Sequence, residues 1–113
     1  MNKISCRGCL AATIAALASA CLLIGPARGQ DAGEKVYKAK CATCHGADGA
    51  GATPVGKATK ARDFRSDEVK KETDEEWTQI VVKGKSKMPA YDKKLTDAEI
   101  KEVVAYVRAL SSK

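Results

Sequence analysis

Histidine, methionine and aromatic residues are scarce in this chain of 113 residues. His45 is the single histidine, and Met88 is the only methionine besides Met1. The chain has one tryptophan, one phenylalanine and three tyrosines, and after residue 29 its only cysteines are Cys41 and Cys44. A small domain with so few large apolar side chains buries little surface on its own, so we expect another component to complete its core.

This scarcity excludes several classes of site. A structural zinc site needs four ligands, and residues 46–113 supply no further cysteine or histidine. A thioredoxin-type motif occurs in a βαβ context, whereas no alternating strand pattern follows Cys41 and Cys44. The net charge of +6 falls to +3 without residues 1–29, which carry three basic and no acidic residues. So small an excess does not support nucleic-acid binding.

What is present is the segment Cys41-Ala42-Thr43-Cys44-His45, the C-x-x-C-H signature of covalent c-type haem attachment. Residues three apart lie on one face of a helical turn, so Cys41 and Cys44 can reach one porphyrin edge and form thioethers with its vinyl groups. His45 follows directly and is placed to bind the iron. The segment predicts one covalently bound haem c, whose apolar ring would supply the missing core.

A six-coordinate haem needs a ligand opposite His45. Met88 is the only methionine after the first residue, and it lies in an irregular stretch before Pro89. A thioether is a soft ligand that raises the reduction potential of haem iron. We therefore predict Met88 as the second ligand by elimination, with lysine as the other side chain able to ligate, and with His45 and Met88 as the metal ligands.

The first 29 residues are typical of a secretory signal peptide. Lys3 and Arg7 precede an uncharged stretch, 10–24, and small residues occupy Ala27 and Gly29 before a cut at Gln30. The apolar stretch is shorter than the roughly 20 residues that span a bilayer. We expect cleavage, export to the periplasm and a haem domain over residues 30–113.

Two other interpretations of this leader remain open. Residues 17–21 loosely resemble a lipoprotein cleavage box, which would leave Cys21 lipidated. The leader could also be retained as an N-terminal anchor. Either would attach the protein to a membrane.

The remaining pattern predicts an all-α fold with three or four short helices. The clearest signals are capping boxes, Thr73 with Glu76 and Thr96 with Glu99, each followed by helically spaced apolar residues. Expected helices run from Asp31 or Gly33 to Lys40, over 67–71, from Thr73 to Gly84, and over 97–110. Glycine-rich residues 46–51 and residues 53–56 are expected to form a loop.

These segments together resemble a small bacterial class I cytochrome c of the mono-haem, c6-like kind. The resemblance rests on Cys41–His45, on Lys87-Met88-Pro89 and on the terminal 95–110 stretch, and it spans 31–112. It implies a cytochrome c fold wrapped around one haem, with the first and last helices crossing near Gly33, Tyr37 and Tyr106.

The resemblance also implies roles near the haem for two further residues. A proline carbonyl after the motif usually accepts a hydrogen bond from the haem-ligating histidine, and Pro54 is the only proline there, in an unusual Thr-Pro-Val context. Trp77 matches positions that contact the haem or its propionates, and plain core packing explains it equally well.

The predicted function is one-electron transfer between redox proteins, without substrate chemistry. Lysines near Met88 and a second basic cluster could steer an acidic partner; they are Lys83, Lys85, Lys87, Lys57, Lys60 and Arg62. We expect a monomer that does not bind nucleic acid. The alternatives are an electron-entry subunit of a membrane or periplasmic oxidoreductase, and a haem enzyme or gas sensor, which would need an open iron position.

Overall fold

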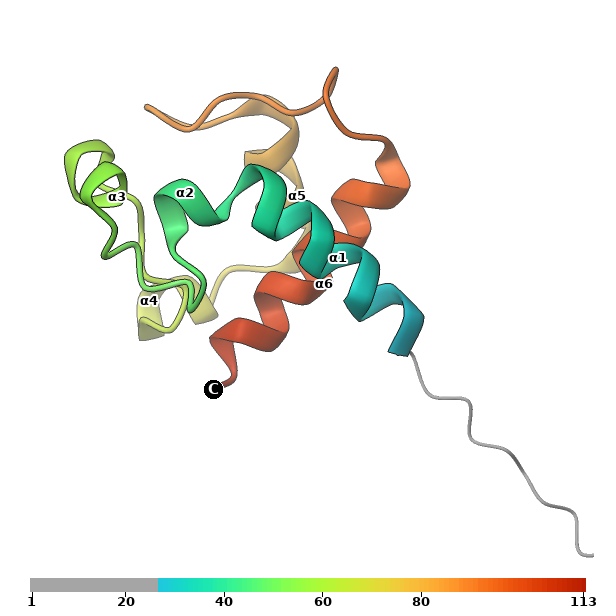
Figure 1. The fold of residues 1–113 in the computed structure, drawn as a ribbon, viewed down its shortest axis with the longest axis horizontal. Helices are drawn as coiled ribbons and strands as arrows, with labels where there is room; N and C mark the ends of the chain where they lie inside the picture. The colour runs from blue at the N-terminus through green and yellow to red at the C-terminus, as the bar shows by residue number, and fades with distance from the viewer. Residues whose placement is uncertain (1–26) are drawn as a thin grey trace, which may run out of the picture.

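The computed structural model describes residues 27–113, and these form an all-α fold (Figure 1). Over this range there is no β-strand, only an isolated bridge between Lys85 and Met88. The helices are α1 (Ala27–Lys40), α2 (Ala42–His45), α3 (Pro54–Thr59), α4 (Asp67–Lys70), α5 (Asp74–Lys83) and α6 (Asp97–Ser111). The predicted all-α class is confirmed. There are six helices instead of three or four because the helical turn predicted for the haem motif forms α2 and because α3 begins in a stretch expected to be loop.

The first and last helices, α1 and α6, cross and pack against each other (Figure 1). Gly33 makes the close approach possible, since a Cβ atom there would collide with the Glu102 carbonyl and lie 2.9 Å from Tyr106 Cβ. The rings of Tyr37 and Tyr106 pack beside this point, with centroids 5.3 Å apart. The crossing implied by the resemblance is confirmed.

Helices α5 and α6 begin where their capping boxes predicted. In each box the threonine hydroxyl accepts from the backbone N–H three residues on, at 3.2 Å for both Thr73 and Thr96. The glutamate carboxylate in turn accepts from the threonine N–H, at 2.7 Å for Glu76 and 2.8 Å for Glu99. These reciprocal bonds satisfy free N–H groups of the first turn.

Helix α3 corrects the expectation that residues 53–56 form a loop. Thr53 caps the helix, its hydroxyl accepting from the Gly56 N–H at 2.8 Å, and Pro54 occupies the first helical position. Proline is favoured there because that position has no intrahelical acceptor for an N–H. A Cβ on Gly56 would collide with the Cys44 carbonyl, so α3 packs directly against α2.

The predicted signal peptide lies outside the described residues except for positions 27–29, with which α1 begins. The helix thus starts before the expected Asp31 or Gly33, and it runs across the predicted cleavage point before Gln30. Cleavage, lipidation of Cys21 and retention of the leader stay predictions. None of the helices described from residue 27 onward is long and apolar enough to cross a membrane.

Candidate functional site

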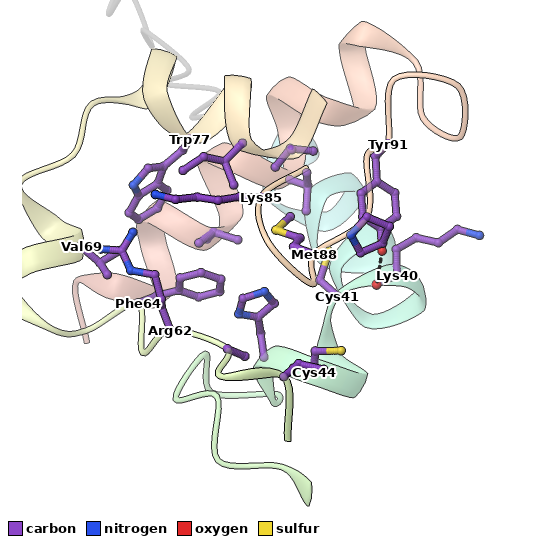
Figure 2. Close-up of a pocket in the computed structure, with 18 of the residues that line it drawn as sticks. Lys40, Cys41, Cys44, Arg62, Phe64, Val69, Trp77, Lys85, Met88 and Tyr91 are labelled. Atoms are coloured by element: carbon purple, nitrogen blue, oxygen red, sulfur yellow. Dashed lines mark hydrogen bonds between the residues drawn. The ribbon is translucent and has the colours of Figure 1, made fainter. Parts of the chain in front are cut away.

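A cavity of about 420 Å³ opens in the middle of the fold (Figure 2). Helix α2 lines one side of it, and the loop 84–96 between α5 and α6 lines another. Its volume lies in the range of small-molecule and cofactor sites, and its walls are predominantly apolar and aromatic, as such sites are. The predicted residues Cys41, Cys44, His45 and Met88 all line this one cavity.

The C-x-x-C-H segment forms a single helical turn. The N–H groups of Cys44 and His45 both donate to the Cys41 carbonyl, at 3.2 and 2.9 Å. Both thiols are free and half-buried. Burial, together with the neighbouring Cys44, raises the pKa of the Cys41 thiol to about 11. The turn thus presents two unpaired thiols and an imidazole to the same cavity.

The His45 ring stacks on Phe64, with centroids 4.4 Å apart and an interplanar angle of 19°. Burial lowers its pKa, and the backbone of Arg62 opposes this shift only in part. The neutral imidazole, which is the form that binds metals, is therefore favoured. Its Nδ1 is buried and has no hydrogen-bond partner among the described residues, so the nearby Arg62 backbone does not satisfy it.

Met88 is held in the loop by backbone bonds. Lys85 and Met88 exchange two of these, at 3.1 and 2.9 Å. The chain turns into this loop at Gly84, whose φ is +73° and where a Cβ would lie 2.8 Å from the Ala90 nitrogen. Two hydrogen bonds between segments far apart in the sequence fix the residues on either side of Met88. The Lys87 ammonium donates to the Ala58 carbonyl, and the Tyr91 hydroxyl donates to the Lys40 carbonyl. The Met88 side chain projects into the cavity (Figure 2).

Trp77 lies where both of its predicted roles, contact with the haem and core packing, are possible. Its side chain lines the cavity and is also part of the buried core cluster. Its indole N–H donates to Glu72 at 3.0 Å, and the Arg108 guanidinium lies over the ring, 3.8 Å from its centroid. Pro54, by contrast, does not line the cavity, because it begins α3. The Pro54 carbonyl does not accept a hydrogen bond from His45, whose buried Nδ1 has no partner among the described residues.

Exposed basic side chains surround the cavity. They are Lys40, Lys60, Lys85 and Lys87, with Arg62 partly buried among them. Lys57 and Lys83 were grouped with these by sequence but do not line the cavity. Lys40 was missed because it lies at the end of α1, far from the other members along the chain. We call Lys40, Lys60, Lys85 and Lys87 the rim lysines.

Three polar residues of the site carried no local sequence signal. Tyr37 is fully buried and donates a 2.6 Å hydrogen bond to the Gly46 carbonyl, directly after the C-x-x-C-H turn. Tyr91 ties the Met88 loop to α1, and Glu72 reaches the cavity wall from the turn between α4 and α5. Each contact joins segments that sequence spacing alone does not bring together.

The cavity fits a covalently attached haem. Its apolar walls match a porphyrin, two free thiols can form thioethers, and a half-buried imidazole and a thioether sulfur are ligands that haem iron accepts. Between residues 27 and 113 no cluster of three or more histidine, cysteine or carboxylate side chains could hold a bare metal ion. Fold and site together define a c-type haem protein.

Comparison with known proteins narrows this class. Residues 28–107 match the family described as cytochrome c oxidase, cbb3-type, subunit III. Cytochrome c6 of Pyropia tenera is 36% identical over 83 residues, which cover 74% of this chain and 94% of that protein. Cytochrome c6 of Gracilaria tenuistipitata var. liui is 40% identical over 77 residues, 68% of each chain.

Solved structures agree with this assignment. The c-type cytochrome KustC0563 superimposes with a TM-score of 0.65 at 36% identity, covering 69% of this chain and 95% of that one. Cytochrome c6 of the diatom Phaeodactylum tricornutum gives a TM-score of 0.56 at 32% identity, with coverage of 74% and 94%. The chain belongs to this family of cytochromes c: it is a small, c6-like class I cytochrome with a covalently bound haem c, and it carries electrons between redox proteins.

Proposed function

We propose that the protein is an exported, periplasmic one-electron carrier. Cys41 and Cys44 hold the haem by thioether bonds, and His45 and Met88 ligate its iron. The observation that carries the proposal is that one cavity is lined by both thiols and the imidazole from α2 and by the thioether from the loop 84–96. When bound, the haem supplies one-electron chemistry as its iron cycles between Fe(II) and Fe(III).

In this function the chain holds the haem, shields it from water and sets its reduction potential. Phe64 supports the His45 ring by stacking, and the bonded loop around Met88 limits its movement. Apolar walls exclude water and so favour the less charged, reduced state of the iron. If His45 and Met88 both ligate the iron, no ligand position would be left for a substrate or gas, which is why we propose no enzymatic activity.

Replacing Met88 tests the ligand assignment. We expect Met88→Ala to abolish the weak far-red absorption band of methionine-ligated ferric haem and to lower the reduction potential, because a thioether stabilises Fe(II). Lys87→Ala is the matched control, since Lys87 is the neighbouring side chain and lysine is the other possible ligand. A band that survives Met88→Ala, or that is lost in Lys87→Ala, contradicts the assignment. A high-spin spectrum in the unaltered protein would favour an enzyme or sensor.

Attachment and export are tested by intact mass. The protein recovered from the periplasm should begin at Gln30 and carry the mass of one haem. Cys41→Ser should still carry the mass of one haem, which a single thioether would hold. Cys41→Ser with Cys44→Ser should carry no haem mass. A mass that includes residues 1–29, or a lipid on Cys21, would contradict cleavage at Gln30 while leaving the haem assignment intact.

A second function, as an electron-entry subunit of an oxidoreductase, is favoured by two of the comparisons. The matching family is described as an oxidase subunit. A chain of the Kuenenia stuttgartiensis reducing HAO-like protein complex also superimposes, with a TM-score of 0.63 at 28% identity, although this protein covers only 44% of that chain. Co-purification with oxidoreductase activity from the native source would favour the subunit, and isolation as a monomer without such activity would favour the free carrier.

A further inference from the structure

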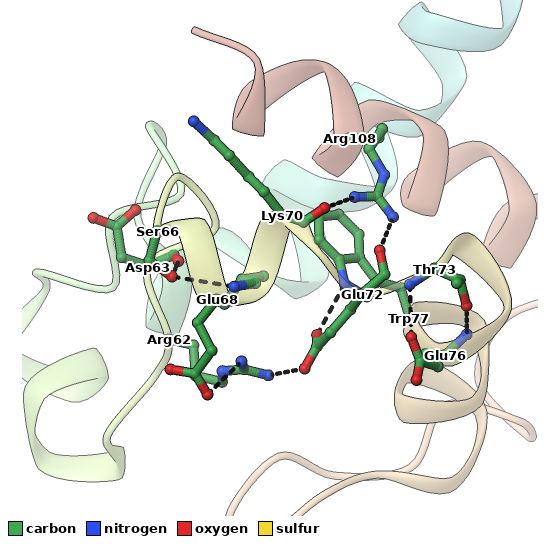
Figure 3. A network of polar contacts seen from close by, with 11 residues as sticks. Arg62, Asp63, Ser66, Glu68, Lys70, Glu72, Thr73, Glu76, Trp77 and Arg108 are labelled. Carbon is green, nitrogen blue, oxygen red and sulfur yellow. Dashed lines mark hydrogen bonds and ion pairs between the residues drawn. The ribbon is translucent and has the colours of Figure 1, made fainter.

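Glu72 is the one acidic residue among the described residues that line the haem cavity. Its carboxylate is held by two donors, the Arg62 guanidinium at 2.6 Å and the Trp77 indole N–H at 3.0 Å (Figure 3). Its backbone carbonyl accepts from the Arg108 guanidinium at 2.7 Å. These three partners come from separate segments, so the position of Glu72 is fixed by tertiary structure.

This carboxylate is shielded and charged. Its side chain is 24% exposed, and although burial raises its pKa, the bonds from Arg62 and Trp77 bring the pKa below the ordinary value. Glu68 offers a contrast: it also approaches Arg62, at 3.5 Å, but its side chain is 88% exposed and does not line the cavity. The two glutamates therefore share Arg62 as a partner and differ in how far their side chains are exposed to water.

We infer that Glu72 lowers the reduction potential of the bound haem by placing a fixed negative charge on the cavity wall. The inference rests on the proposed haem site. An electron entering the haem adds negative charge, and a carboxylate nearby opposes that step more strongly where little water screens it. Glu72 is a positioned charge, not an iron ligand.

Arg62 carries the opposite charge to Glu72, so the two residues should act on the haem in opposite directions. The positive charge of Arg62 partly cancels that of Glu72, so removing each partner changes the field at the haem in opposite directions. Loss of Glu72 leaves Arg62 with only the exposed Glu68 as an acidic partner and favours Fe(II). Loss of Arg62 leaves Glu72 uncompensated and favours Fe(III). Loosening of the cavity wall would instead admit water in both variants and move both potentials the same way.

The experiment is a midpoint-potential titration of the holoprotein by spectroelectrochemistry at fixed pH and low salt. We expect Glu72→Gln to shift the redox equilibrium about three- to tenfold toward the reduced form, where tenfold corresponds to about 59 mV. Arg62→Gln should shift it toward the oxidised form. Glu68→Gln, the matched control, should shift it far less than Glu72→Gln.

An unchanged potential in Glu72→Gln, equal shifts in Glu72→Gln and Glu68→Gln, or shifts of the same sign in Glu72→Gln and Arg62→Gln would overturn the inference. If Glu72→Gln alone does not fold, the double variant Glu72→Gln with Arg62→Gln is compared with Arg62→Gln. The double variant should have the higher potential, and an equal or lower potential would overturn the inference. The absorption spectrum and the covalently bound haem mass are recorded for each variant. They report on the haem site itself, so the proposed function can stand while this inference fails.

Discussion

At the scale of single residues, Tyr37 links the helix crossing to the haem motif. Its hydroxyl donates to the Gly46 carbonyl, and both residues are buried. We expect Tyr37→Phe to lower the free energy of unfolding by about 1–3 kcal/mol, because the Gly46 carbonyl would be left buried without its donor. Denaturant unfolding of the holoprotein measures this. Tyr106→Phe, which removes the hydroxyl of the partner ring and leaves this bond intact, should cost less; an equal cost would show that the effect does not come from the bond to Gly46.

The same phenol predicts how stability changes in alkali. Burial raises the pKa of Tyr37 above its ordinary value of about 10. Its contribution is therefore fully present below pH 10 and is lost as the pH rises, because the unfolded chain releases the proton first. Above pH 10 the loss approaches about 1.4 kcal/mol per pH unit. Tyr37→Phe should flatten the decline by that amount, and parallel curves for the two proteins would contradict the assignment.

At the scale of elements, the α1–α6 crossing depends on Gly33. A methyl group there would meet the Glu102 carbonyl and Tyr106 Cβ, so Gly33→Ala should force the helices apart. We expect a loss of about 1–3 kcal/mol in the free energy of unfolding, typical of overpacking. Thermal and denaturant unfolding provide the measurement. Lys35→Ala, at an exposed site of α1, is the control and should change stability little. Equal losses in the two variants would count against a close crossing.

Elements set by local chemistry were the ones that the sequence predicted well. The capping boxes at Thr73 and Thr96 act within four residues, so their helices begin where expected. Helix α3 was missed because Pro54 was taken as a loop marker, although a threonine cap followed by proline is equally a helix start. His45 was predicted as an iron ligand from the C-x-x-C-H motif and Met88 by elimination, and the ligation by both residues stays a prediction. The bonds of Glu72 depend on Arg62, Trp77 and Arg108 coming together, which no local pattern encodes.

At the scale of the whole molecule, charge is distributed unevenly about the cavity. The rim lysines Lys40, Lys60, Lys85 and Lys87 are exposed around it, while Glu72, the only acidic residue on the described wall, is shielded. If electrons leave through this face, it should attract anionic partners. Such attraction acts over about one Debye length, roughly 10 Å at 0.1 M salt, and therefore weakens as salt is added.

Reaction with an anionic oxidant, hexacyanoferrate(III), tests this distribution. Replacing Lys40 and Lys87 together by glutamine should slow oxidation about threefold at low ionic strength, with the difference vanishing at high salt. The control replaces Lys35 and Lys101 by glutamine, which removes the same charge from exposed positions outside the cavity lining. Stopped-flow absorbance of the haem measures both rates. If the two double variants slow equally, net charge alone steers the reagent, and the rim lysines do not form a docking face for acidic partners.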